Sequence, residues 1–392
     1  MLTIPLTYAQ PGMVLALPLY SPRGDLLLNQ GVQLQPYMVD YLQQSGFTKV
    51  CVRDRETEDL EIKETISGRL RTKATSTVSR IFDTIEAAAT EAPKQLDHIQ
   101  ALVRDSGFKQ KLLSSPEFND LPRTAEEVMN EALELDLLSS LGTLKSHDDY
   151  TFGHCVDVAV TAVVIGRELR FSKDQLRLLA QGAMLHDIGK VFIERAVLNK
   201  PSQLDADELQ IMQHHPTLGF EMIREADIEL LPKHVALQHH ERQNGSGYPR
   251  GLTGTNRVAK SRQERDSSIA LIGEVAAVAD VYDALTSDRP YRPGLPPDQV
   301  AAILASMAGT HLNEEIVRKF LMVLEAFPVG LNVRIVEGRY HNHRGVVTES
   351  KPWRMDRPTV RLLSDANGAR ISPIDVDLEA DDSMHLVSVD RV

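Results

Sequence analysis

The chain is poor in cysteine and in aromatic residues, and it carries no excess of basic charge. Only two of its 392 residues are cysteines, Cys51 and Cys155, and only 5% are aromatic. Two cysteines cannot build a disulfide framework, so we expect a protein of a reducing, cytoplasmic compartment. Acidic residues outnumber basic residues by 55 to 43, which gives a formal charge of −12. This balance favours solubility and argues against binding of the whole chain to large nucleic acids or anionic lipid.

Long apolar runs are also absent from the sequence. The longest one, residues 158–166, is bounded by Asp157 and Arg167 and is far shorter than the roughly 20 residues that cross a bilayer. We therefore expect no membrane partner. With 42% hydrophobic and 25% charged residues, the composition is that of a globular protein rather than a disordered or collagen-like chain. The length allows two or three domains of roughly 100–200 residues each.

Four regions differ in their sequence pattern. Residues 1–55 are typical of a small β-rich regulatory module, and residues 56–121 predict a helical connector because apolar residues recur at spacings of three and four. Residues 122–327 predict a compact all-α bundle. Residues 328–392 contain short β-branched runs between turn residues. The expected fold class is therefore mainly α: an all-α bundle with a small β-rich N-terminal module and a small β C-terminal unit.

Single elements can also be predicted within these regions. The first region predicts a helix over residues 35–44 and a closing strand over residues 49–52. In the bundle, Asp205 and Glu208 form a capping box that predicts a helix start, and Gly189 is expected to cap a helix at its C-terminus. The strands predicted in the last region are residues 333–336, 345–348, 359–363 and 369–371.

Histidines and carboxylates gather in the predicted bundle, which holds most of the 13 histidines. A buried carboxylate is costly unless it is paired or bound to a metal ion. Imidazole and carboxylate together suit Zn, Mn, Fe, Co or Ni, and carboxylates bridge ions about 3.5–4 Å apart in enzymes that displace phosphoryl groups. A lone histidine is more often structural, but this clustering predicts a metal site. The candidate residues are His154, His186, Asp187, His214, His215, His239, His240 and Asp280.

A glycine-rich stretch follows the last histidine pair. Gly245 and Gly247 allow backbone turns that other residues cannot adopt. Tyr248 and Pro249 then offer a flat, rigid surface, which beside a metal site suits stacking against a nucleobase. The competing interpretation is an ordinary glycine-rich turn. Of the neighbours His214 and His215, one must point away from the site; we expect it to be His214.

Three cationic residues lie close to the candidate ligands in the sequence. Lys190 is about one helical turn past Asp187 and is placed to point into the same cavity. Arg289 and Arg292 follow the predicted helix that contains Asp280, where they are placed to clamp phosphate oxygens. The competing interpretation is that both arginines are solvated surface residues, because charges usually face water.

In chain order, these residues form one extended set of motifs. The order is His154, then His186-Asp187-Ile-Gly-Lys190, His215-Pro216, His239-His240-Glu241-Arg242, Gly245-Ser-Gly-Tyr-Pro249, Asp280-Val-Tyr-Asp283 and Arg289-Pro-Tyr-Arg292. This set resembles the HD-GYP family, a subgroup of the HD phosphohydrolase superfamily, over about residues 122–327. The resemblance implies an all-α HD fold and hydrolysis of the bacterial second messenger cyclic di-GMP to pGpG or on to GMP.

The same resemblance implies a role for each residue. Two divalent ions, Fe or Mn being favoured, would be bridged by Asp187, and a bridging hydroxide would attack phosphorus. Asp187 and Lys190 would be the catalytic residues. One ion would have the ligands His154, His186, Asp187 and Asp280, and the other would add His215, His239 and His240 to the bridge. The implied substrate-binding residues are Lys190, Tyr248, Pro249, Asp283, Arg289 and Arg292.

The sequence departs from the family pattern at three places. Asn244 stands where the loop usually begins with Asp, which removes a charge. Tyr150 stands where some members carry a Glu that supports a third metal, so we expect two ions; Asp148 and Asp149 lie off that helix face. Residues 256–268 form a polar insertion that is typical of a surface loop.

These departures leave two alternative functions open. One is a slow or inactive cyclic di-GMP-binding signalling protein that acts through its terminal modules on protein partners. The other is an HD phosphohydrolase that acts on another nucleotide. The oligomeric state, including a homodimer, is also left open by the sequence.

Overall fold

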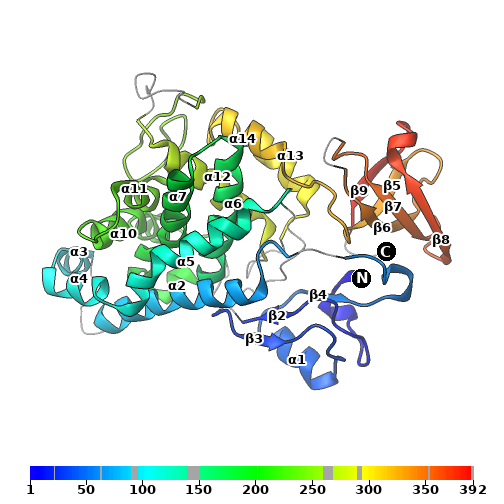
Figure 1. Cartoon of the computed structure of the whole chain (residues 1–392), viewed down its shortest axis with the longest axis horizontal. Helices are drawn as coiled ribbons and strands as arrows, with labels where there is room; N and C mark the ends of the chain where they lie inside the picture. The colour runs from blue at the N-terminus through cyan, green and yellow to red at the C-terminus, as the bar shows by residue number, and fades with distance from the viewer. Residues whose placement is uncertain are drawn as a thin grey trace.

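The computed structural model describes residues 1–21, 23–61, 64–89, 96–136, 138, 151–200, 202–258, 268–288, 294–351 and 354–389. Helices fill the middle of the chain, and small sheets lie at both ends (Figure 1). This arrangement confirms the predicted fold class. The predictions for Asp148, Asp149, Tyr150, Arg289 and Arg292 fall outside the described residues, as does the stretch 259–267 of the predicted insertion.

The N-terminal module consists of two small antiparallel sheets and one helix. Its elements are β1 (Leu2–Pro5), η1 (Leu6–Tyr8), β2 (Leu19–Tyr20), β3 (Leu26–Leu28), α1 (Pro36–Gln44), β4 (Lys49–Val52) and η2 (Arg55–Thr57). Strand β1 pairs with β4, and β2 pairs with β3. Buried residues such as Leu15, Leu34 and Phe47 give the module its own apolar core. The predicted helix and closing strand are confirmed.

The helical part has one continuous apolar core. Its helices are α2 (Gly68–Ala89), α3 (Leu96–Leu102), α4 (Ser106–Leu113), α5 (Pro116–Leu133), α6 (Thr151–Glu168), α7 (Lys173–Leu185), η3 (Ile188–Phe192), α8 (Arg195–Leu198), α9 (Ala206–Met212), α10 (His215–Ile223), α11 (Leu230–Gln238), α12 (Leu271–Thr286), α13 (Pro297–Met307) and α14 (Glu314–Leu321). The core runs from Ile66 to Leu324, so the predicted connector packs through α2, α4 and α5 into the same core as the bundle. Helix α6 is apolar almost all round and is therefore buried, which also buries the polar residues it carries.

Local sequence signals set the helix ends near the histidines. The Asp205 carboxylate accepts from the Glu208 amide at 3.0 Å and Glu208 reciprocates, which confirms the predicted capping box before α9. The prediction that Gly189 caps a helix is wrong, because α7 already ends at Leu185 and Gly189 lies inside η3. A Cβ at Gly189 would lie 2.0 Å from the carbonyl oxygen of His215, so glycine serves the close approach of η3 to α10.

The C-terminal unit is a five-stranded antiparallel sheet in the order β8-β7-β6-β5-β9. Its elements are β5 (Asn332–Glu337), β6 (Arg344–Glu349), β7 (Thr359–Ser364), β8 (Arg370–Asp377), η5 (Leu378–Ala380) and β9 (His385–Ser388). The four predicted strands are confirmed, and β9 is an additional strand that closes the edge beside β5. Buried residues such as Val333, Val347 and Leu362 form its separate core.

The two ends of the chain contact each other. Figure 1 shows the C-terminal sheet beside the N-terminal module. Arg361 on β7 donates to the Glu56 carbonyl oxygen at 2.9 Å and to the Asp59 carboxylate at 2.6 Å. Leu60 packs with Val346 of the sheet in a small buried cluster. Among the described helices, none is both long and apolar enough to cross a membrane.

Candidate metal centre

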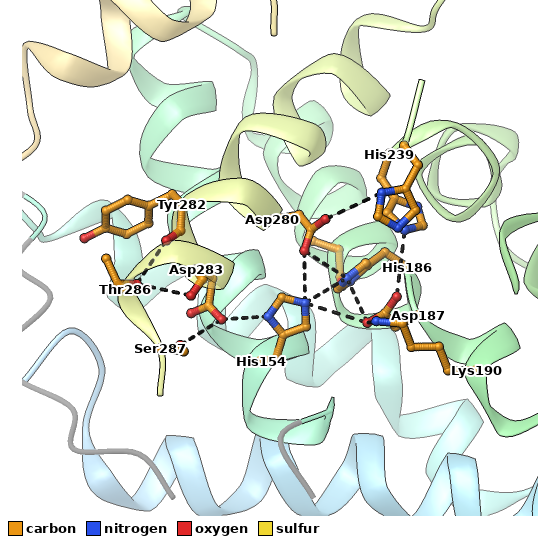
Figure 2. A network of polar contacts seen from close by, with 12 residues as sticks. His154, His186, Asp187, Lys190, His239, Asp280, Tyr282, Asp283, Thr286 and Ser287 are labelled. Carbon is orange, nitrogen blue, oxygen red and sulfur yellow. Dashed lines mark hydrogen bonds and ion pairs between the residues drawn. The ribbon is translucent and has the colours of Figure 1, made fainter. Parts of the chain in front are cut away.

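The structure brings the predicted ligands together from several helices that are distant in the sequence (Figure 2). His154 is in the first turn of α6, and the carboxylate ligand Asp280 lies inside α12. His186 and Asp187 lie where α7 breaks into η3, so the helix end turns both side chains inward. His215 opens α10, and the pair after α11 completes the set. The seven residues are His154, His186, Asp187, His215, His239, His240 and Asp280.

One side of the centre is a carboxylate-rich cluster, made of His154, His186, Asp187 and Asp280. His154 Nε2 lies 3.1 Å from Asp280 Oδ1 and 3.2 Å from His186 Nε2. His186 Nε2 lies 3.4 Å from Asp187 Oδ2. His154, His186 and Asp187 are at most 2% exposed. Nitrogen and oxygen donors thus converge on one small buried volume, a donor set that suits a divalent transition metal.

The other side is an imidazole cluster, made of His215, His239 and His240. Its ligand atoms all lie within 4.8 Å of one another, and His215 Nε2 is 3.3 Å from His239 Nε2. His240 is the most exposed of the three and lies 4.0 Å from Asp280 through Nδ1. This second cluster has no carboxylate of its own in the described residues; the nearest ones, Asp187 and Asp280, belong to the first cluster.

Hydrogen bonds from Nδ1 atoms to backbone carbonyl oxygens determine the tautomers of these histidine rings. The Nδ1 atom of His186 donates to the Ala183 carbonyl oxygen at 2.7 Å, and that of His215 donates to Met212 at 2.8 Å. A neutral ring that donates from Nδ1 carries a lone pair on Nε2. In the imidazole cluster two such Nε2 atoms, those of His215 and His239, face each other at 3.3 Å. Two lone pairs at that distance repel unless a cation lies between them, so the chemistry of the donor set fits metal binding.

Asp187 lies between the two clusters and presents one oxygen to each. Oδ2 faces His186 at 3.4 Å and accepts from Lys190 Nζ at 2.5 Å. Oδ1 faces His215 at 3.5 Å and His239 at 3.8 Å. Oδ1 is buried and has no hydrogen-bond partner among the described residues. Because a buried carboxylate oxygen without a hydrogen bond is costly, this orphan atom is itself a sign of an additional cation.

The two clusters differ in the pKa values of their histidines. Burial alone would lower the pKa of His154, but hydrogen bonds to Asp280 and Asp283 raise it to about 9. Burial lowers the pKa of His215 to about 3 and that of His239 to about 4. The imidazole cluster is therefore neutral at pH 7, the protonation state that ligates metal. Burial opposes ionisation of Asp187, but the charges of His186 and Lys190 hold its pKa well below its ordinary value.

The glycine-rich loop is folded back against the imidazole cluster. The Tyr248 ring stacks on His240 with ring centroids 4.7 Å apart and an interplanar angle of 30°. A Cβ on Gly247 would lie 2.4 Å from the Arg242 amide nitrogen, so only glycine allows this close backbone approach. Asn244 accepts from the Ser246 amide at 3.0 Å, so it retains the turn that an Asp would make.

Glu241 is a buried residue beside the centre to which the sequence interpretation gave no role. Its carboxylate is 3% exposed and accepts from the Arg250 amide at 2.8 Å and the Leu252 amide at 2.7 Å. These bonds tie the far side of the loop to the histidine pair that precedes it. The available signal was its position, directly between a ligand pair and a glycine-rich loop.

Asp283 lies behind His154 in the structure. Its Oδ2 accepts from His154 Nδ1 at 2.7 Å and from Ser287 Oγ at 3.2 Å, and the residue is 2% exposed (Figure 2). The predicted substrate contact of Asp283 stays a prediction, whereas its observed contacts orient a ring of the centre. His214 directly precedes α10, and it is in neither of the two groups of ligand atoms found among the described residues.

Comparisons with known proteins find matches to the region that contains this centre. Residues 128–316 match the family model described as HD domain. The cyclic di-GMP phosphodiesterase PA4108 of Pseudomonas aeruginosa is 35% identical over 230 residues, which cover 58% of this chain and 51% of that protein. The 3'3'-cGAMP-specific phosphodiesterase 3 of Vibrio cholerae is 30% identical over 241 residues, 60% of this chain and 50% of its own length.

A response regulator shows a similar match. The cyclic di-GMP phosphodiesterase response regulator RpfG of Xanthomonas campestris is 33% identical over 214 residues, 54% of this chain and 52% of that protein. The chain thus spans about half the length of these curated relatives. The matched region contains the complete set of candidate ligands. Residues 128–316 are therefore similar to HD domain proteins, and the motifs in this region and the named relatives support its resemblance to the HD-GYP type.

Proposed function

We propose that this chain is a metal-dependent phosphodiesterase that hydrolyses cyclic di-GMP. The observation that carries the proposal is the position of Asp187, whose two oxygens face two separate clusters of ligand atoms. Paired metal sites bridged in this way are typical of enzymes that displace phosphoryl groups. The names of the relatives PA4108 and RpfG support cyclic di-GMP as the substrate.

The two clusters are the proposed ligand sets. The carboxylate-rich cluster would hold one ion and the imidazole cluster a second, with Asp187 shared. When bound, such ions lower the pKa of a water molecule and stabilise negative charge on phosphate oxygens. Mixed imidazole and carboxylate ligands suit iron or manganese, which are the metals we favour.

The chain's own residues would bind and orient the substrate. Lys190 is partly exposed beside Asp187, so its ammonium group is placed to meet a phosphate oxygen. Tyr248 and Pro249 border the imidazole cluster, where a ring surface suits a guanine base. Arg289 and Arg292 are proposed as further phosphate ligands on the sequence alone. Cleavage of one ester bond yields pGpG, and a second cleavage would yield GMP.

The terminal modules are the parts of the proposed enzyme that would connect it to a signalling system. They carry no metal-ligating cluster in their described residues, so we assign them to protein partners or to a second copy of the chain. The scarcity of cysteine supports a cytoplasmic location.

A substrate panel tests the proposed function. Protein loaded anaerobically with Fe(II) or Mn(II) is incubated with cyclic di-GMP, 3'3'-cGAMP and pGpG, and the products are separated by chromatography. We expect cyclic di-GMP to be consumed fastest and pGpG to appear first. Faster turnover of 3'3'-cGAMP would transfer the proposal to that nucleotide, which the Vibrio cholerae relative supports. Binding of cyclic di-GMP without turnover under either metal would favour a signalling protein that has lost catalysis.

A further inference from the structure

The C-terminal end of α12 is held by hydrogen bonds from the amides of Gly294 and Leu295. Asp288 Oδ1 accepts from the Gly294 amide at 2.7 Å, and the Leu295 amide donates to the Leu285 carbonyl oxygen at 2.8 Å. A Cβ on Gly294 would lie 2.0 Å from the Thr286 carbonyl oxygen, so the returning chain packs directly on the helix end. Asp288 therefore holds Gly294 against the C-terminal end of α12.

The other oxygen of Asp288 is engaged by a residue from the opposite end of the sequence. Thr48 Oγ1 of the N-terminal module donates to Asp288 Oδ2, a contact between residues 240 positions apart. Thr48 is itself fixed, because its carbonyl oxygen accepts from the Leu6 amide at 2.7 Å and the next residue begins β4. The module thus presents a hydroxyl, directly before β4, to the end of the helix that carries Asp280 of the metal centre and Asp283, the partner of His154.

A short path of hydrogen bonds leads from this helix end to the centre. Ser287, the neighbour of Asp288, is 2% exposed and donates through Oγ to Asp283 at 3.2 Å. Asp283 accepts from His154 Nδ1 at 2.7 Å, as Figure 2 shows. A shift of the helix end would therefore move the carboxylate that orients His154, and small displacements of such groups lower catalytic rates.

We propose that Asp288 is a positioning residue through which the N-terminal module, by way of Thr48, sets the geometry of the metal centre. The module is in turn held by the C-terminal sheet, where Arg361 contacts Asp59 and the Asn332 side chain donates to the Thr3 carbonyl oxygen at 2.7 Å. The position of the terminal modules is thereby coupled to turnover. The effect on turnover rests on the proposed function, whereas the coupling of the module to α12 does not.

The test compares Thr48→Val, which removes the donor, with Thr48→Ser, which keeps it. Asp83→Ala is the matched control, because Asp83 on α2 pairs with Arg23 of the same module at 2.7 Å rather than with the end of α12. For metal-saturated full-length protein we expect Thr48→Val to lower kcat/KM for cyclic di-GMP by about three- to tenfold, the range for loss of one hydrogen bond. Metal content and Tm should not change, and Thr48→Ser and Asp83→Ala should match the wild type.

Hydrogen exchange gives a readout that does not depend on activity. In Thr48→Val, amides in peptides that cover residues 283–288 should exchange faster than in the wild type, and Asp83→Ala should leave them unchanged. Unchanged exchange and kcat/KM in Thr48→Val would overturn the proposal. An equal effect of Asp83→Ala would also overturn it, because any module contact would then suffice. If wild-type protein hydrolyses none of the nucleotides, the proposed function fails, and the exchange data alone decide the coupling.

Discussion

The two histidine clusters are built from the same residue type but have opposite electrostatic character. In the carboxylate-rich cluster, hydrogen bonds to Asp280 and Asp283 outweigh burial and raise the pKa of His154 to about 9. In the imidazole cluster, burial dominates and lowers the pKa of His215 to about 3. The comparison teaches that His154 is held in its charged form by its carboxylate partners, whereas the imidazole cluster stays neutral and offers lone pairs.

The acceptors of the hydrogen bonds from the histidine Nδ1 atoms also differ between the two clusters. His154 donates from Nδ1 to a carboxylate, Asp283, whereas His186, His215 and His239 donate to backbone carbonyl oxygens. A carboxylate behind an imidazole makes it a more basic ligand than a carbonyl does. We therefore expect the ion in the carboxylate-rich cluster to be bound more tightly than the ion in the imidazole cluster.

The largest expected effect comes from removing the residue that the clusters share. Asp187→Ala should lower kcat for cyclic di-GMP by at least roughly a thousandfold, more than the loss of a single transition-state donor costs. Without the carboxylate, two cations would lie close together uncompensated, so the metal content per chain should also fall. Turnover kinetics and elemental analysis of the same preparation measure both effects.

Asp174→Ala is the control for this variant, because Asp174 is exposed in the first turn of the same helix, α7. It should retain the wild-type rate and metal content. Circular dichroism should show that Asp187→Ala keeps its helical fold. Wild-type turnover by fully metallated Asp187→Ala would contradict the shared role of this residue.

The second prediction concerns the stability of metal-free protein as a function of pH. His154 has a pKa of about 9 in the folded state against 6.5 as its ordinary value, so its contribution is complete below about pH 6.5 and is lost as the pH rises towards 9. His215 and His239, at about 3 and 4, contribute above pH 6.5 and lose that contribution as the pH falls. The free energy of unfolding should therefore be highest near pH 6.5, and the alkaline loss should be on the order of 3 kcal/mol.

Denaturant titrations in the presence of a chelator, from pH 5 to 10, measure this curve. In His154→Gln the loss between pH 6.5 and 9 should disappear, while the loss at acid pH remains. Stability that rises between pH 6.5 and 9 would show that the carboxylates do not stabilise a charged His154.

The smallest of the three effects should come from Asp283→Asn, which replaces the carboxylate behind His154 by an amide. Loss of such an outer partner typically lowers metal affinity or activity about 10- to 100-fold. We expect one ion per chain to bind more weakly and the other to keep its wild-type affinity, because Asp283 hydrogen-bonds His154 of the carboxylate-rich cluster. Competition titrations with a metal-sensitive dye separate the two ions. An equal loss of binding affinity for both ions would argue that the clusters do not bind metal independently.

Residue patterns predicted the helices and the C-terminal strands, because apolar periodicity is a local property of the sequence, and the predicted gathering of histidines and aspartates is seen in the structure. Gly189 was assigned wrongly because its role depends on His215, which approaches only in the folded chain. The contact of Thr48 with Asp288 spans 240 positions and has no local signature at either residue. The same holds for Arg361, whose partner Asp59 lies in another module.

The central claim is that two metal ions lie on either side of Asp187. Anomalous diffraction from crystals of the 392-residue chain loaded with Mn(II) tests it most directly. The account predicts two peaks, one among His154, His186 and Asp280 and one among His215, His239 and His240, with Asp187 between them. A single peak at saturating metal, or peaks that Asp187 does not bridge, would contradict it.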